Sequence, residues 1–195
     1  IPKRDWSSDV CSSDLDILEV FSIYGQANTS SLEASRIVIQ FPVDQIIADR
    51  NSKKIGSTGN VEFILKLSNA VHGESTPSNF DLVVSPLSRS WDEGFGLDME
   101  DYKDLGAVNW LSASSTAAWT SEGGDTLAVE FKQNFSAGTE DLQLDITSLV
   151  EDWISSAVQN NGILIKLSSS QEQSSGSYYT KKFFARGSEI GRAHV

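Results

Sequence analysis

The sequence predicts an all-β domain, an antiparallel jelly-roll β-sandwich with one short helix. Several short segments alternate apolar and polar residues with a period of two, which is typical of strands with one buried face. Only one stretch has convincing helical periodicity, and polar loops separate the strand candidates. A parallel sheet would need strands and helices in regular alternation, so an antiparallel arrangement is favoured.

The strand candidates begin with residues 17–24 (ILEVFSIY) and residues 36–41 (RIVIQF), the second of which is stopped by Pro42. Residues 43–50 fit a helical turn. The other segments with strand periodicity are residues 61–67, 80–86, 127–131, 142–146, 162–167 and 178–185.

The one predicted helix begins near residue 147 and has about two to three turns. Thr147 and Ser148 are both candidates for its N-cap, since a hydroxyl there can accept a backbone N–H. Its apolar residues share one face: Leu149, Val150, Trp153 and Ile154.

Composition restricts the possible partners. The 195 residues include 27 acidic and 15 basic side chains, which give a net charge of −12. We therefore expect no nucleic-acid partner and no anionic membrane surface, because both would repel the chain. No run of about 18 apolar residues occurs, so no membrane-spanning helix is predicted.

The two ends resemble translated sequencing adapter. Residues 9–14 (DVCSSD) and residues 190–195 (IGRAHV) can be encoded by opposite strands of one oligonucleotide. We therefore expect residues 1–15 and 190–195 to be artefactual, with the domain in residues 16–189. Cys11 then says nothing about redox compartment, and the domain is expected to be a piece of a longer product.

The order of several motifs resembles a known family. These motifs are FDLVVSPLSRSW at 80–91, WTSEGGD at 119–125, DITSLVEDW at 145–153, NNGILIKL at 160–167 and SYYTKKFFAR at 177–186. They are similar to the DNRLRE-type domain, a jelly-roll sandwich related to carbohydrate-binding modules of secreted and surface proteins. The amino-acid sequence of these motifs also resembles that of uncharacterised proteins of marine phages.

The resemblance implies an extracellular or virion location. It implies other virion or surface subunits, or polysaccharide, as partners. Family members end in a further strand that the chain lacks after Glu189, so the resemblance predicts an unpaired sheet edge.

An acidic loop at residues 91–106 is the candidate metal site. Asp98, Glu100 and Asp101 supply hard oxygen ligands of the kind that a structural Ca²⁺ prefers. Their spacing does not match an EF-hand, and a solvated acidic loop is the alternative. No other cofactor is predicted.

Aromatic residues supply the candidate ligand surface. Four of them are candidates to offer a ring for stacking: Tyr102, Trp110, Tyr178 and Tyr179. Tyr178 and Tyr179 would face opposite sides of a strand, so one of these two is expected outside. The positions of Trp91, Trp119 and Trp153 in the family motifs favour burial in the core instead.

Three further features have simple structural interpretations. Lys181 and Lys182 are predicted to protect the edge of a strand. His72 fits a surface turn, because no nucleophile elbow accompanies it. Residues 123–125 (GGD) are predicted to form a tight turn, since no Gly-Lys-Ser/Thr follows them.

No catalytic constellation occurs, and we expect the domain not to be an enzyme. The sequence favours a non-catalytic structural or adhesive module of a larger extracellular or virion protein. A carbohydrate-binding module that tethers a larger protein to polysaccharide is the alternative. A jelly-roll glycosidase or lyase, using carboxylates of the acidic loop, is the second alternative.

Overall fold

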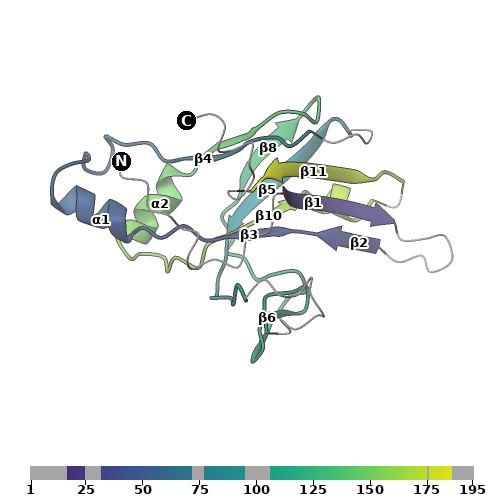
Figure 1. Ribbon diagram of the computed structural model, residues 1–195, viewed down its shortest axis with the longest axis horizontal. Coiled ribbons are helices and arrows are strands. Elements are labelled where there is room, and N and C mark those ends of the chain that lie inside the picture. Colours follow the sequence, from purple (N-terminus) through teal and green to yellow (C-terminus); the bar gives the residue numbers. More distant parts are fainter. Residues whose placement is uncertain (1–16, 25–31, 72–76, 95–105, 175, 186–195) are drawn as a thin grey trace.

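Two antiparallel β-layers face each other across an apolar core (Figure 1). The structure is a computed structural model that describes residues 17–24, 32–71, 77–94, 106–174 and 176–185. In the first layer, β1 (Ile17–Tyr24) lies between β11 (Tyr179–Phe184) and β2 (Leu32–Ser35). Two more strands, β4 (Ile64–Leu67) and β9 (Leu142–Asp145), pair with each other beside β11.

The chain just after β4 joins these two parts of the first layer. The backbone N–H of Phe184 donates to Ser68 O at 3.0 Å, and the N–H of Ala70 donates to Lys182 O at 3.0 Å. β11 is therefore hydrogen-bonded on both sides. The unpaired edge that the resemblance predicted does not lie along β11, which occupies an interior position.

The second layer contains β3 (Ile37–Ile39), β10 (Ile163–Leu167), β5 (Phe80–Pro86) and β8 (Phe131–Phe135), hydrogen-bonded in that order. From β2 to β5 and from β8 to β11 the layer strands alternate between the two layers, whereas β1 and β2 are neighbours in the same layer. This architecture confirms the predicted all-β sandwich. The jelly-roll connectivity stays a prediction, which the interleaved strand order favours.

The core lies between the layers, where alternate residues of each strand point inward. Val20 and Phe183 enter it from the first layer, and Phe80, Phe135 and Ile165 enter it from the second. The rings of Phe80 and Phe135 stack with centroids 5.2 Å apart. Full burial of each such side chain contributes about 1.5 to 3 kcal/mol.

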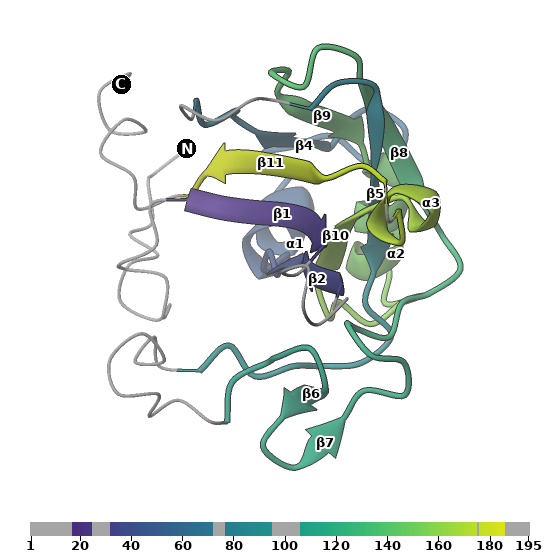
Figure 2. The same cartoon turned by 90° about the vertical axis from the view of Figure 1, so that its right-hand side faces the viewer.

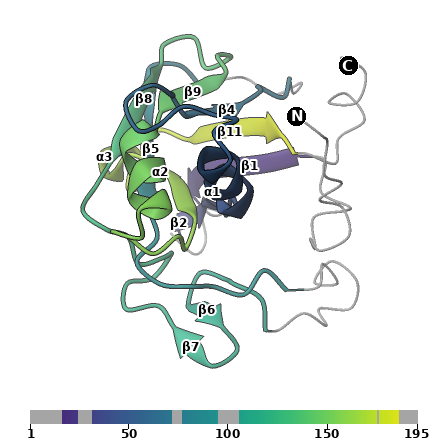
Figure 3. The ribbon, with the colours of Figure 1, turned by 90° about the vertical axis from the view of Figure 1, so that its left-hand side faces the viewer.

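The predicted helix is α2 (Thr147–Ile154), and it covers one end of the core with Leu149, Val150 and Trp153 (Figure 3). Neither predicted residue caps it. Thr147 is the first helical residue, and its hydroxyl accepts the N–H of Phe63 at 2.8 Å. The carboxylate of Asp145 accepts the N–H of Thr147 at 2.9 Å instead.

The described residues contain two further helices, so the prediction of a single helix is wrong. α1 (Asp44–Asn51) replaces the expected helical turn, and α3 (Ser169–Glu172) is one turn after β10. α1 buries no side chain, and Arg50 joins it to Glu151 of α2 through two hydrogen bonds of 2.6 and 2.7 Å. Such a helix depends on its tertiary partner and leaves a weak apolar pattern.

The chain between β5 and β8 leaves the sandwich and forms a small hairpin of β6 (Ser112–Ser114) and β7 (Ala117–Ala118), set off from the two layers in Figure 2. The excursion packs on the outer face of the second layer. A second, smaller core forms there from Leu87, Ala113, Trp119 and Leu164, with Val38, Trp91 and Val108 against it.

The strand boundaries follow the sequence most closely in the buried strands. β1 and β5 have the predicted limits. The predicted strand at 127–131 is displaced, because β8 begins at Phe131 and continues through polar residues. β2, β6 and β7 were not predicted, since they are short and contain few large apolar residues.

Lys181 and Lys182 lie on β11 and do not protect an edge. The Lys181 residue is only 1% exposed and its side chain enters the core, whereas Lys182 Nζ lies 3.6 Å from the carboxylate of Glu19. The prediction was wrong because β11 has neighbours on both sides.

Candidate binding cleft

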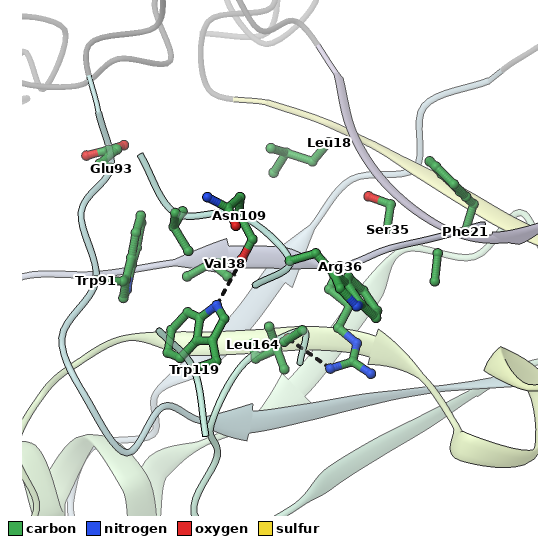
Figure 4. A pocket seen from close by; sticks show the side chains of 14 residues that line it. Leu18, Phe21, Ser35, Arg36, Val38, Trp91, Glu93, Asn109, Trp119 and Leu164 are labelled. Atoms are coloured by element: carbon green, nitrogen blue, oxygen red, sulfur yellow. Dashed lines mark hydrogen bonds between the residues drawn. The ribbon is translucent and has the colours of Figure 1, made fainter. Parts of the chain in front are cut away.

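A cleft of about 550 Å³ lies where the β5–β8 excursion meets the β1–β2 edge of the first layer. Its floor includes Val38 and Leu164, two apolar residues on the outer face of the second layer. Figure 4 shows the indole rings of Trp91 and Trp119 on one side and Arg36 on the other. The aromatic and polar side chains of its wall are Phe21, Trp91, Trp110, Trp119, Ser35, Arg36, Asn109 and Glu93.

The indoles of Trp91 and Trp119 are fixed by their own N–H groups. Trp119 Nε1 donates to Asn109 O at 2.9 Å, and Trp91 Nε1 donates to Asn161 O at 3.0 Å. With these donors satisfied, the rings are held in place as an apolar wall. Trp119 is 8% exposed and Trp91 is half-buried. Burial is thus confirmed for Trp119, as for Trp153 in the main core, and only in part for Trp91.

Trp110 is the predicted ligand residue that the cleft contains. It is 37% exposed, and the Arg36 guanidinium carbon lies 4.6 Å from the centroid of its ring. A cation at this distance attracts the electron-rich face of an indole. One face of Trp110 is therefore used inside the protein, while the rest of the ring stays accessible at the rim.

Arg36 holds the cleft together. Its Nε and Nη2 donate to the two carboxylate oxygens of Glu172 at 2.8 and 2.7 Å, and its Nη1 donates to Gly123 O at 2.8 Å. The side chains of Arg36 and Glu172 are only 14% and 8% exposed. The guanidinium charge is thus neutralised within the protein, and Arg36 positions the parts around it.

Only glycine fits at residue 123. Its φ is +82°, and a Cβ there would lie 2.4 Å from Arg36 Nη1 and 3.0 Å from the Trp110 ring. Gly124 also has a positive φ. The predicted tight turn is confirmed, and its backbone approaches the guanidinium as closely as the glycine allows.

Asp125 completes this turn by accepting the N–H groups of Thr120 and Ser121 at 2.9 and 2.8 Å. Partial burial acts to raise the pKa of Asp125, but these backbone donors outweigh it and keep that pKa below the usual range.

At the cleft, loss of hydration raises the pKa of the Glu93 carboxyl above the usual range. Glu93 is the only acidic side chain among the described residues that line the cleft.

A second, polar hollow of about 770 Å³ shares Arg36 with the cleft and is also lined by Glu172. Its other charged groups include Arg89, which donates to Ala118 O at 2.6 Å and lies 3.5 Å from Asp125. These pairings leave the hollow without a strong excess of either charge. We therefore interpret it as the solvated side of the Arg36 cluster.

The remaining predicted site residues are not in the cleft. Tyr178 is 56% exposed but does not line it. Tyr179 is the inward member of the pair, since the centroid of its ring lies 5.9 Å from that of Phe80 at the core, and it offers no exposed platform. The other candidates fall outside the described residues: His72, Asp98, Glu100, Asp101 and Tyr102.

Sequence reasoning did not single out Arg36, Gly123 or Glu172 as a cluster. The one local signal was the GGD turn, because the three partners come from distant parts of the chain. Across the described ranges, no group of three or more His, Cys, Asp and Glu side chains gathers as a metal site. No described helix is both long and apolar enough to cross a membrane.

Comparisons of the chain with protein-family models, with curated proteins and with solved structures give no match. The resemblance to DNRLRE-type domains therefore stays a prediction. The interpretation of the cleft depends on its own geometry.

Proposed function

We propose that this domain is a non-catalytic binding module that takes a segment of carbohydrate in the tryptophan cleft, as part of a larger extracellular or virion protein. The observation that carries the proposal is the cleft itself, with indole rings fixed by internal hydrogen bonds. Its volume falls within the range of about 300 to 1,000 Å³ that is typical of small-ligand sites, and its aromatic lining is typical as well.

Trp110 is the residue on which the proposal depends most. Sugar rings present apolar C–H faces that pack on aromatic rings, while their hydroxyls need a few polar neighbours. Asn109 and Glu93 provide polar groups beside the rings. Arg36 holds Trp110 before any ligand arrives, which reduces the conformational entropy lost on binding.

The carboxyl groups among the described cleft residues support the non-catalytic part of the proposal. Most glycosidases need two carboxyl groups about 5 to 9.5 Å apart across the scissile bond. Among the described cleft residues, Glu93 has no carboxylate partner. A single carboxylate can accept a hydrogen bond from a sugar hydroxyl without performing hydrolysis.

A second candidate is a structural or adhesive module whose partners are other virion or surface subunits. The observation in its favour is a set of large apolar side chains on the surface. Val71 is 88% exposed and Leu111, next to Trp110, is 59% exposed. Covering such apolar side chains with a partner is favourable, because it removes their surface from water.

Affinity gel electrophoresis against neutral and acidic polysaccharides, followed by a glycan array, tests the proposal. We expect at least one polysaccharide to retard the wild type and Trp110→Ala to weaken that binding by about tenfold or more. Tyr178→Ala is the matched control, since it removes an exposed aromatic ring outside the cleft. Its retardation should equal that of the wild type.

Two results would contradict carbohydrate binding in the cleft. One is the absence of retardation by every polysaccharide in the panel. The other is equal weakening by Trp110→Ala and Tyr178→Ala. In the first case, sedimentation of the protein at increasing concentration would test whether copies of the chain associate through their exposed apolar residues.

A further inference from the structure

The core of the sandwich contains an amine. Alternation along β11 directs Lys181 inward together with Phe183. Lys181 is 1% exposed, and its Nζ lies 4.9 Å from the ring centroid of Phe135 and 5.2 Å from that of Phe183. A lysine so deeply buried is unusual, because its charge loses most of its hydration.

Three oxygen atoms surround the amine. Lys181 Nζ donates to Asn69 Oδ1 at 2.6 Å, to Gly138 O at 2.9 Å and to Glu140 O at 2.7 Å. The last two belong to the chain between β8 and β9, which closes over the amine. Of the three, the Asn69 oxygen differs chemically, because it belongs to a side-chain amide that an amine can attack.

We propose that Lys181 and Asn69 condense to form an amide bond between their side chains. The Lys181 Nζ–Asn69 Cγ bond forms and the Asn69 Cγ–Nδ2 bond breaks. The attacking nitrogen gives up one proton to the departing nitrogen, which leaves as ammonia. Atoms and electrons balance without an oxidant, a reductant or another reactant.

The distance suits this attack. The Lys181 Nζ to Asn69 Oδ1 contact is 2.6 Å. Since a C=O bond is about 1.23 Å long, Nζ lies no more than about 3.8 Å from Asn69 Cγ. A near-attack contact is about 3 to 3.5 Å, so small side-chain rotations complete the approach. Because this contact is built into the fold, the reaction is effectively intramolecular.

Burial also supplies the reactive form of the amine. It lowers the pKa of Lys181 to about 8, against the opposing charges of Glu140 and Asp141. A small fraction of Lys181 is then neutral and nucleophilic near pH 7. Competing water is largely excluded from the site, which also protects the new bond from hydrolysis.

Two carboxylates stand beside the reacting groups. Asp141 Oδ1 accepts the backbone N–H of Asn69 at 2.8 Å and so holds the residue that is attacked. Glu140 has one carboxylate oxygen, Oε2, that is buried and lacks a hydrogen-bond partner. Their negative charges would stabilise the attacking nitrogen while it becomes positive.

The bond would tie the chain after β4 to β11, two neighbouring segments of the first layer that are 112 residues apart in sequence. A cross-link there would hold the C-terminal strand against unzipping. This consequence does not depend on carbohydrate binding, so the two proposals can fail separately.

Intact mass spectrometry of the purified full chain tests the proposal directly. We expect a mass lower than the sequence mass by about 17 Da, the mass of ammonia. After proteolysis, tandem mass spectra should contain one branched peptide that joins Lys181 to Asn69. An intact mass equal to the sequence mass, in protein kept at pH 8 to 9 for several days, would overturn the proposal.

Variants identify the origin of any mass loss. Lys181→Met and Asn69→Ala should both restore the full sequence mass, and Lys182→Arg, the matched control on the same strand, should keep the loss. A cyclic imide formed by Asn69 with its own backbone also loses ammonia, but it needs no lysine. A loss that persists in Lys181→Met would therefore contradict the cross-link.

Discussion

The Arg36–Glu172 ion pair allows the most quantitative prediction. Replacing Arg36 by Met keeps much of the side-chain length and removes the guanidinium. The carboxylate of Glu172, 8% exposed, then loses both of its donors at 2.8 and 2.7 Å. Breaking a buried pair on one side costs about 3 to 5 kcal/mol, because the remaining charge stays buried without compensation.

Smaller losses add to this cost. The carbonyl of Gly123 loses a 2.8 Å hydrogen bond, and the Trp110 ring loses the cation on its face. Each is worth about 0.5 to 1.5 kcal/mol. For a domain of this size, a loss of about 4 kcal/mol corresponds to a fall in Tm of roughly 10 °C.

Urea unfolding followed by tryptophan fluorescence and circular dichroism measures the loss. Coincident transitions would justify a two-state analysis. The informative control is the double variant Arg36→Met/Glu172→Met, in which neither charge remains. Since apolar replacement of a whole buried pair is often neutral or stabilising, the double variant should be more stable than Arg36→Met alone. Glu172→Gln gives a milder perturbation if Arg36→Met does not fold.

Two results would refute this reasoning. A loss below about 1 kcal/mol for Arg36→Met would place the pair among exposed salt bridges, which contribute little. A double variant that is no more stable than Arg36→Met alone would show that the two side chains do not act as a unit.

Two further predictions concern other parts of the domain. Gly123→Ala should lower the free energy of unfolding by more than about 1 to 2 kcal/mol, the cost of a left-handed residue, because its Cβ also meets Arg36 Nη1. Urea unfolding measures this loss. The control is Gly59→Ala, whose Cβ would meet nothing within 4 Å, so that it reports the backbone strain without the clash. Glu140→Gln should weaken the acid dependence of stability. The N–H of Ala137, with the Ser136 hydroxyl, lowers the pKa of Glu140 from 4.5 to about 2, so its ionised form stabilises the fold above pH 4.5 and this contribution is lost as pH falls through 2. Thermal melts should then differ between wild type and variant at pH 6 and converge near pH 2; equal differences at both values would contradict the assignment.

The parts of the fold that the sequence predicts well are those decided by local pattern. β1 and β5 alternate strongly over seven or eight residues, and both have the predicted limits. α2 has a distinct apolar face and was also predicted. By contrast, α1 buries no side chain and is joined to α2 by the Arg50–Glu151 pair, 101 residues apart. No local window contains that information.

The site was harder to predict for the same reason. Trp110 was selected because it lies between polar residues, and it does line the cleft. Arg36 and Glu172 are 136 residues apart, and neither has a neighbour in sequence that reveals the pairing. Lys181 was assigned to an edge because lysines often protect edges. The pairing of β11 on both sides removes that edge, and the alternation that buries Phe183 directs Lys181 into the core as well.

Arg36 and Lys181 together raise a question that stability alone does not answer. Both are charged groups withdrawn from water, and in each case apolar residues of similar volume could fill the space at equal or lower free energy. If Arg36 serves only the fold, Arg36→Met/Glu172→Met should bind polysaccharide as the wild type does. If it serves to place Trp110, that variant should remain folded and lose retardation. Lys181→Met tests the amine in the same way. If this variant folds but shows no mass loss, Lys181 is needed for the cross-link and not for packing of the core.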